Sequence, residues 1–261
     1  MKYRLLPMLF LALMFLVVRE PKAEEPQSTL DVVKARGTLL AGLRNDYPPA
    51  GYVDEQGNWV GFDLDVAQLI ADKLGVKLER VQVASKTRVP LLVNGNVDLV
   101  IATFGPTSER AEVVDFAGPY FIGSMKILTT KETGIQTTDD LAAPKRTGMV
   151  QGSADGPRLM SYQPDANLVY FQEWPQAVLA LKQGQVDAVY TTDVTLATFA
   201  KKDPDLVIVG RNESPDPYMI GVRQNDSKWR LFLETTIMEA WSDGTLEKIY
   251  LNYLPEVTFT L

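Results

Sequence analysis

Apolar residues recur along the chain in two alternating patterns from Leu30 onward. Short apolar runs, such as residues 38–43, predict buried strands, and apolar residues at helical spacing, such as 62–74, predict helices. Gly75 follows the latter run and is a typical helix stop. The pattern also predicts strands at 76–83, 97–103, 125–130, 147–151, 168–171 and 186–191, and helices at 89–93, 175–182 and 227–253, the last broken near Gly244. This alternation predicts an α/β fold with mostly parallel sheet.

One phrase occurs twice in the sequence. Residues 95–100 are GNVDLV and residues 184–189 are GQVDAV, and each phrase follows a predicted helix. In both, the glycine suits a helix C-cap and the next residues suit a strand that enters a sheet. Two structurally similar lobes would explain the repetition, and so would the common similarity of helix–strand corners. Ligands bind α/β sheets at the carboxyl ends of strands, so the loops that follow these strands are candidate binding loops.

The first 23 residues differ from the rest of the chain. Lys2 and Arg4 precede an apolar run at 5–18, and charge returns at Arg19. The run is too short to cross a bilayer comfortably, so we interpret residues 1–23 as a secretory signal peptide rather than a membrane anchor. The chain contains no Cys, so we expect neither a lipid-attachment cysteine nor disulfides.

Composition narrows the possible functions. The net charge is −7, and the first 23 residues contain four basic residues and one acidic residue, so the remainder carries −10. This acidity argues against nucleic acid and anionic lipid as partners. The chain has no His and no Cys, which excludes Ser-His-Asp and Cys-His catalysis and thiolate zinc sites. Carboxylates near helix starts, such as Asp63, suit stabilisation of the helix dipole. We therefore expect binding rather than catalysis, with no metal and no cofactor.

Several phrases together resemble the bacterial extracellular solute-binding protein family 3, the polar amino acid receptors of ABC importers. They follow one another in the family's order over roughly residues 30–254, which is far more specific than any single motif. The phrases are GLRNDYPP (42–49), GFDLDVA (61–67), RVPLL (88–92), VDLVIAT (97–103), TSERA (107–111), VDF (114–116), PYF (119–121), QGS (151–153) and GQVDAV (184–189).

The resemblance implies a two-lobed, periplasmic-binding-protein-like α/β fold of type II, in which two hinge strands join the lobes. We expect the hinges near 120–124 and 218–222. The first lobe would then contain residues 24–124 and 218–261, so that both ends of the mature chain contribute to it. The second lobe would contain residues 125–217.

The resemblance also implies a site for a ligand carboxylate. Arg110 matches the family arginine that binds the α-carboxylate, because a guanidinium donates two parallel hydrogen bonds to such a group. The alternative is a surface arginine paired with a neighbouring carboxylate. Thr103 and Gly105 match positions that contact the same carboxylate, and Ser153 and Ala154 match the segment of the second lobe whose N–H groups help to hold the ligand. Gly105 departs from the family, which usually has Thr there, so only its backbone can serve.

Two further arginines bear on the ligand's side chain. Arg44, Arg88 and Ser85 occupy positions that the glutamate/aspartate subgroup uses for that side chain. Three converging arginines suit a second carboxylate, because an unpaired buried guanidinium is costly. An equally open interpretation is that Arg88 braces its loop and Arg44 faces solvent. Tyr47 matches an aromatic wall residue, and packing is its alternative role.

The ammonium site departs from the family pattern. Relatives place an Asp directly after the second repeated strand, and Thr192 occupies that position here, followed by Asp193. Either Asp193 substitutes for the usual residue, or Thr192 contacts a ligand that lacks a strong ammonium. Asp193 also suits a helix N-cap.

These features predict the substrate-binding component of an ABC importer. We expect a monomer in the periplasm that clamps a small polar amino acid, of the glutamate or aspartate type, and serves an inner-membrane permease. One alternative is a receptor for a dicarboxylate without an amino group. Another is an enzyme like the cyclohexadienyl dehydratases, which resemble this family. The enzyme would need a general acid in the cleft, and Glu173 and Asp155 are candidates by position.

Overall fold

A nine-stranded mixed sheet runs through the molecule in the computed structural model, which describes residues 27–211 and 214–255. Its strands are β1 (Thr38–Leu43), β5 (Lys77–Gln82), β6 (Leu99–Phe104), β7 (Val114–Thr130), β8 (Arg146–Val150), β9 (Asn167–Phe171), β10 (Ala188–Thr192), β11 (Leu206–Val209) and β12 (Pro215–Arg223). The strand order is β5-β1-β6-β12-β7-β10-β8-β9, and β11 pairs with β7. A separate small sheet contains β2 (Asp46–Tyr47), β3 (Gly51–Val53) and β4 (Trp59–Val60).

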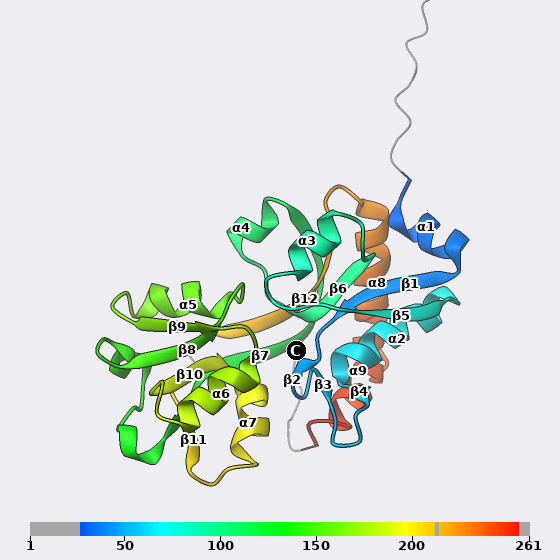
Figure 1. The fold of residues 1–261 in the computed structure, drawn as a ribbon. Coiled ribbons are helices and arrows are strands. Elements are labelled where there is room, and N and C mark those ends of the chain that lie inside the picture. Colours follow the sequence, from blue (N-terminus) through cyan, green and yellow to red (C-terminus); the bar gives the residue numbers. More distant parts are fainter. Residues whose placement is uncertain (1–26, 212–213, 256–261) are drawn as a thin grey trace, which may run out of the picture.

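Helices pack around these strands (Figure 1). They are α1 (Thr29–Arg36), α2 (Phe62–Leu74), α3 (Arg88–Val93), α4 (Ser108–Ala111), α5 (Asp155–Tyr162), α6 (Trp174–Lys182), α7 (Asp193–Ala200), α8 (Ser227–Ser242) and α9 (Thr245–Leu251), with short 3-10 turns at Lys131–Thr133 and Thr138–Leu141. Among the described residues, no helix is both long and apolar enough to cross a membrane. The predicted signal peptide, residues 1–23, lies outside the described residues.

The first lobe is built on the parallel strands β5, β1 and β6. Both faces of β6 are buried, so alternate residues of this strand enter different cores. Leu99 and Ile101 belong to the core that includes residues of α2 and α8. Val100, Ala102 and Phe104 belong to the core that includes Leu92 of α3. The loop at the carboxyl end of β6 is therefore anchored between two packed layers.

The second lobe repeats this arrangement on a smaller scale. β9 and β10 lie parallel to β8, while β7 runs antiparallel to both of its neighbours, β10 and β11. Helices α5, α6 and α7 pack against it. Figure 1 shows this lobe in green and yellow, whereas the first lobe combines the blue and cyan segments with the orange and red helices α8 and α9.

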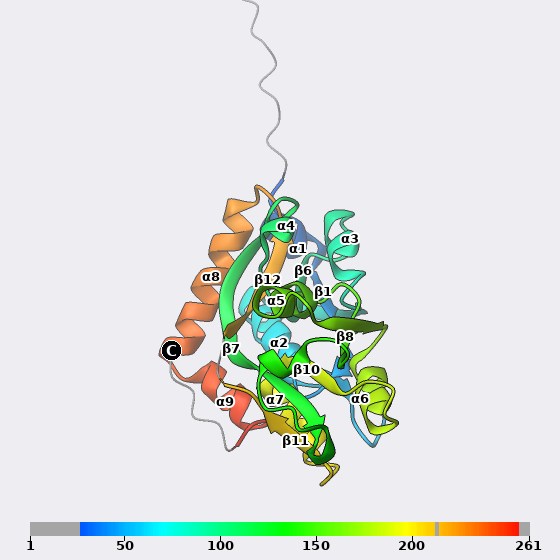
Figure 2. The same cartoon turned by 90° about the vertical axis from the view of Figure 1, so that its left-hand side faces the viewer.

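Two long antiparallel strands join the lobes. β12 pairs with β7 from Arg223 opposite Val114 to Pro215 opposite Ser124. Beyond this point β7 continues into the second lobe, where it pairs with β10. Figure 2 shows β7 curving past α8 toward that lobe. The predicted two-lobed α/β fold with two hinge strands is confirmed, and the boundaries at residues 125 and 217 stay a prediction.

The repeated phrase has the same structure in both lobes. The glycine of each phrase, after α3 and after α6, has a left-handed φ, at 76° and 68°. Asp98 accepts a hydrogen bond from the Leu40 N–H (2.7 Å), and Asp187 accepts one from the Arg146 N–H (2.7 Å). Each aspartate thus ties the start of its strand to the neighbouring parallel strand, β1 or β8.

Most predicted elements are present with ends shifted by one or two residues. The exception is the strand predicted at 125–130, which is the second half of β7 and in fact begins at Val114. Gly118 and Pro119 interrupt the apolar pattern of its first half, which lies among the hinge residues rather than inside one core. The break predicted near Gly244 is confirmed, because this residue separates α8 from α9 with a φ of 75°. The helices α1, α4, α5 and α7, the strand β11 and the small sheet were not predicted.

Candidate ligand site

A cavity of about 300 Å³ lies between the lobes, among loops at the carboxyl ends of the parallel strands. Nine of the eleven predicted ligand-binding residues line it, namely Arg44, Tyr47, Ser85, Arg88, Thr103, Gly105, Arg110, Ser153 and Ala154. Four residues that were not predicted to bind the ligand also line it, namely Asp155, Trp174, Asp216 and Tyr218. Thr192 and Asp193 do not line it.

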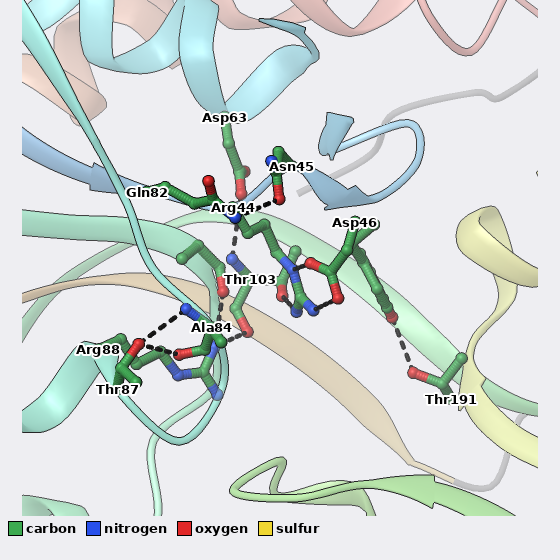
Figure 3. A network of polar contacts seen from close by, with 12 residues as sticks. Arg44, Asn45, Asp46, Asp63, Gln82, Ala84, Thr87, Arg88, Thr103 and Thr191 are labelled. Carbon is green, nitrogen blue, oxygen red and sulfur yellow. Dashed lines mark hydrogen bonds and ion pairs between the residues drawn. The ribbon is translucent and has the colours of Figure 1, made fainter. Parts of the chain in front are cut away.

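Thr103, at the end of β6, has a strained backbone that its neighbours hold in place. Its φ is 48°, which β-branched residues rarely adopt. Its N–H donates to Asp63 Oδ2 (3.1 Å), and its hydroxyl accepts a hydrogen bond from Arg44 Nη1 (3.0 Å). Its carbonyl accepts one from Arg88 Nη1 (3.3 Å). Figure 3 shows these residues converging on Thr103, whose hydroxyl keeps its proton for another acceptor.

Asp63 anchors this arrangement from behind the cavity. Its side chain is fully buried and accepts hydrogen bonds from the Thr103 N–H and from the Tyr120 hydroxyl (2.8 Å). Burial raises the pKa of Asp63 to about 6, and the two hydrogen bonds and the Arg44 charge oppose that rise. The carboxylate therefore does more than stabilise the dipole of α2, which was its predicted role.

Arg44 is buried and already paired. Its guanidinium donates to both Asp46 carboxylate oxygens (2.8 and 2.9 Å) and lies 4.5 Å from the centre of the Tyr47 ring (Figure 3). The pair with Asp46 raises the pKa of Arg44 despite its burial. The alternative that Arg44 faces solvent is wrong, and its charge is neutralised by a residue only two positions away.

Arg88 is equally buried but forms no ion pair with a carboxylate in the part of the chain that the structure describes. Its Nη1 donates to the carbonyls of Ala102 (2.6 Å) and Thr103 (3.3 Å), and the guanidinium lies 4.5 Å from the centre of the Phe104 ring. Its Nε has no hydrogen-bond partner. Burial, followed by the charges of Arg110 and Arg44, lowers the pKa of Arg88 well below its ordinary value. A nearby anion would relieve this unfavourable charge.

Arg110 crosses from the first lobe to the second. One of its Nη atoms donates to the Gly105 carbonyl and the other to the Gly152 carbonyl (2.8 Å). Burial lowers the pKa of Arg110, and the Asp155 carboxylate is the first influence that opposes this. Gly105 contributes its backbone carbonyl here as an acceptor for Arg110, and its predicted backbone contact with the ligand carboxylate stays a prediction.

The facing wall comes from the turn after β8 and the start of α5. Ser153 Oγ, and Ser85 Oγ on the first lobe, are buried and have no hydrogen-bond partner. Asp155 accepts a hydrogen bond from the Thr191 hydroxyl (2.9 Å), and that hydroxyl is bonded to the Tyr47 hydroxyl (2.7 Å). Because Thr191 gives its proton to Asp155, Tyr47 must donate to Thr191.

Thr192 and Asp193 do not line the cavity. The predicted alternatives were that Asp193 substitutes for the family's ammonium-binding Asp, or that Thr192 contacts a ligand that lacks a strong ammonium. β10 ends at Thr192, whose hydroxyl donates to Asp216 (2.6 Å). Asp193 begins α7 and accepts hydrogen bonds from the N–H groups of Val194 (2.7 Å) and Ser124 (3.3 Å). Asp193 is thus engaged with the backbone at the start of its own helix and in β7.

The residues that were missed left weak signals in the sequence. Asp155 was noted only as a candidate general acid, and Glu173, its companion in that role, is exposed at the N-cap of α6 and does not line the cavity. Trp174 opens a helix whose predicted start was one residue later. Asp216 and Tyr218 lie at the edge of the predicted hinge, where an apolar pattern does not indicate which side chains face a cavity.

The chain is similar to known proteins in both sequence and structure. Residues 39–256 match the family described as bacterial extracellular solute-binding proteins, family 3. The ABC transporter glutamine-binding protein GlnH of Bacillus subtilis is 30% identical over 241 residues, which cover 91% of this chain and 88% of the relative.

Two solved structures share the fold and more than a quarter of their sequence with this chain. Holo ArgBP from T. maritima has a TM-score of 0.76 at 35% identity and covers 84% of this chain and 99% of its own. The ancestral amino acid-binding protein AncCDT-1, a precursor of cyclohexadienyl dehydratase, has a TM-score of 0.80 at 29% identity and covers 87% and 99%. The chain therefore belongs to the bacterial extracellular solute-binding proteins, family 3.

Proposed function

We propose that the protein is the substrate-binding component of an ABC importer and holds a small polar amino acid of acidic type, glutamate or aspartate, between its lobes. The observation that carries this proposal is a set of buried donors without acceptors. Arg88 Nε, Ser85 Oγ and Ser153 Oγ have no partner, and Arg88 forms no ion pair with any described residue. Such donors cost free energy when empty, so they favour a ligand that supplies acceptors.

The number of unpaired guanidiniums supports an acidic ligand. Arg110, like Arg88, forms no ion pair in the part of the chain that the structure describes. The ligand's α-carboxylate can form an ion pair with Arg110, and a second carboxylate on the ligand's side chain would give Arg88 its counter-charge. Arg44 is paired with Asp46, so in this proposal its role is to position Thr103. The ligand then meets two arginines rather than three.

The relatives support the amino acid class. GlnH and ArgBP are named for glutamine and arginine, which share the α-carboxylate and α-ammonium of every amino acid but differ in their side chains. The proposal that the ligand's side chain is acidic therefore depends on Arg88 and Ser85. Family membership places the protein outside the cytoplasm, and we propose that it acts as a monomer in the periplasm and serves an inner-membrane permease.

Calorimetry and thermal unfolding of the protein, refolded from denaturant to remove bound ligand, test the proposal. The panel contains glutamate, aspartate, glutamine, asparagine and arginine. We expect glutamate or aspartate to bind most tightly and to raise the Tm most, since a ligand stabilises the state that it binds. Binding of glutamine in preference to glutamate would overturn the acidic class alone. If no amino acid binds, the proposed function as an amino acid receptor is wrong.

A second candidate function is a dehydratase-like enzyme, which one observation favours. Burial, followed by the negative charge of Asp216, raises the pKa of Asp155 to about 6, and a carboxyl with such a pKa can act as a general acid near neutral pH. AncCDT-1 is itself an amino acid-binding protein, but as a precursor of cyclohexadienyl dehydratase it links this fold to such an enzyme. Turnover of prephenate or arogenate by the purified protein would support it, and the absence of turnover would remove it.

A further inference from the structure

The cavity contains one carboxylate for which the protein supplies no paired cation. Asp155 is 8% exposed, accepts a hydrogen bond from Thr191, and forms no ion pair within residues 27–211 and 214–255. The other cavity carboxylate, Asp216, is paired with Arg158 (2.7 Å) and also accepts a hydrogen bond from Thr192 (2.6 Å). A buried carboxylate without a paired cation is costly, so Asp155 favours a ligand that carries a positive group.

Asp155 also lies in the right place relative to the carboxylate site. An α-amino acid carries its ammonium and its carboxylate on the same carbon, so the two protein charges that meet them must be neighbours. Asp155 and Arg110 line the same cavity, and Arg110 donates a hydrogen bond to the carbonyl of Gly152, three residues before Asp155. The chain of hydroxyls from Tyr47 through Thr191 fixes the orientation of the Asp155 carboxylate.

The unpaired donors on the opposite wall favour a ligand in this cavity. Arg88 Nε and Ser85 Oγ line the same cavity as Asp155, and these residues are 2% and 5% exposed. The cavity therefore offers buried donors to an anionic group and a buried acceptor to a cationic one. That combination matches a ligand with both charges.

We infer that Asp155 binds the ligand's ammonium group, in place of the acidic residue that the family usually carries at position 192. This inference rests on the proposed amino acid ligand. Thr192 is fully buried and donates its hydroxyl proton to Asp216, so it does not face the ligand. Asp193 is held by two backbone N–H groups outside the cavity. The ammonium site has thus moved from the end of β10 to the start of α5.

The test compares ligands that differ only in the amino group. Each amino acid that binds is paired with its analogue lacking that group, such as glutarate for glutamate or glutaramate for glutamine. Calorimetry measures Kd for both members of the pair with the wild type, Asp155→Asn and Asp193→Asn. We expect Asp155→Asn to weaken binding of the amino acid by about 30-fold or more, as for a buried charge pair that loses one partner. Binding of the analogue should not weaken, because the analogue has no ammonium group for Asp155 to pair with.

The remaining outcomes separate this inference from the proposed function. Full preference for the amino acid in Asp155→Asn, or loss of that preference in Asp193→Asn alone, would overturn the inference. Equal affinity of the wild type for both members of the pair would also overturn it. Asp155→Ser repeats the test with a second neutral side chain, and loss of both ligands by both folded variants would assign Asp155 a structural role instead. A wild type that binds no amino acid contradicts the proposed function itself.

Discussion

Arg44 and Arg88 both line the cavity from the first lobe, yet their charges are balanced in different ways. Arg44 has the Asp46 carboxylate, whereas Arg88 has backbone carbonyls and an aromatic ring. Removing one partner of a buried ion pair leaves the other charge buried and unpaired. Removing a lone buried cation leaves no such charge behind. Substitution of Arg44 should therefore affect mainly the folding stability, whereas substitution of Arg88 should affect mainly ligand binding.

We expect Arg44→Gln to lower the free energy of unfolding of the ligand-free protein by about 3 kcal/mol, because Asp46 loses its partner. Arg88→Gln should cost less stability but weaken binding of an acidic amino acid by about 30-fold or more. Urea unfolding measures the first quantity and calorimetry the second. If the two variants lose stability equally and bind equally well, the distinction between a paired and an unpaired arginine is wrong.

Asp63 gives the folding stability a dependence on pH. Its folded pKa of about 6 lies above the ordinary value of 3.8, so the folded state binds this proton more tightly than the unfolded state does. The resulting stabilisation is complete below about pH 4 and is lost as the pH rises toward about 6. Relative to Asp63→Asn, we expect the wild type to lose up to about 3 kcal/mol between about pH 4 and pH 7. Urea unfolding at both pH values tests this prediction. It would be contradicted if the free energy of unfolding of the wild type, minus that of Asp63→Asn, stayed constant or increased with pH.

The sequence was sufficient to bring most cavity residues together but not to assign their partners. Arg110 and Thr103 could be placed from family phrases, because the loop between β6 and α4 is short and anchored at both ends. Whether an arginine is paired depends on side-chain directions, which no periodic pattern records. Asp46 is two residues from Arg44, but Asp63 and Thr103 are 40 residues apart in the chain. The strain at Thr103 likewise results from tertiary contacts.

At the scale of elements, the repeated helix–glycine–strand unit carries one aspartate in each lobe. Asp98 is 3% exposed and accepts hydrogen bonds from the Leu40 N–H and from Arg36. The Asp187 side chain is 24% exposed and accepts hydrogen bonds from the N–H and the guanidinium of Arg146. The same phrase therefore makes the same link to a neighbouring strand at two different degrees of burial.

This difference predicts unequal costs for one substitution in the two lobes. Asp98→Asn should lower the free energy of unfolding by about 2 kcal/mol, because a buried charged acceptor is lost. Asp187→Asn should cost less than about 1 kcal/mol, because solvent screens the more exposed pair. Urea unfolding of both variants measures the difference. Equal costs would mean that burial does not set the strength of this link.

The two hinge strands were poorly defined by the apolar pattern for a physical reason. The first half of β7 and all of β12 run between two lobes, so their residues face a cavity, a hinge and two cores in turn rather than one core at period two. Thr192 illustrates the consequence at the end of β10. Its position in the sequence matches the family's ammonium site, but its hydroxyl is bonded to Asp216 on the hinge strand β12.

At the scale of the whole molecule, the two lobes touch each other directly as well as enclosing the cavity. Tyr47 reaches across to the Thr191 hydroxyl (2.7 Å), and its ring meets Trp174 edge-on at 5.7 Å. Arg110 donates to the Gly152 carbonyl (2.8 Å). A ligand that contacts both walls adds to these contacts, and it can shift the lobes toward this arrangement only by binding it better than an open one.

Gly152 lies against the first lobe, and it allows a direct test of closure. Its φ is +77°, and a Cβ at this position would lie 2.7 Å from Lys86 Cα in the first lobe. Gly134→Ala is the matched control, because its φ is +72° and a Cβ there meets nothing within 4 Å.

Both substitutions should cost the ligand-free protein about 1 kcal/mol of backbone strain. Gly152→Ala should in addition weaken ligand binding by about 10- to 100-fold, because the lobes can no longer close fully. Calorimetry compares the affinities, and small-angle scattering with ligand should show Gly152→Ala to be the more extended variant. Equal affinities and dimensions would show that ligand binding does not require this contact.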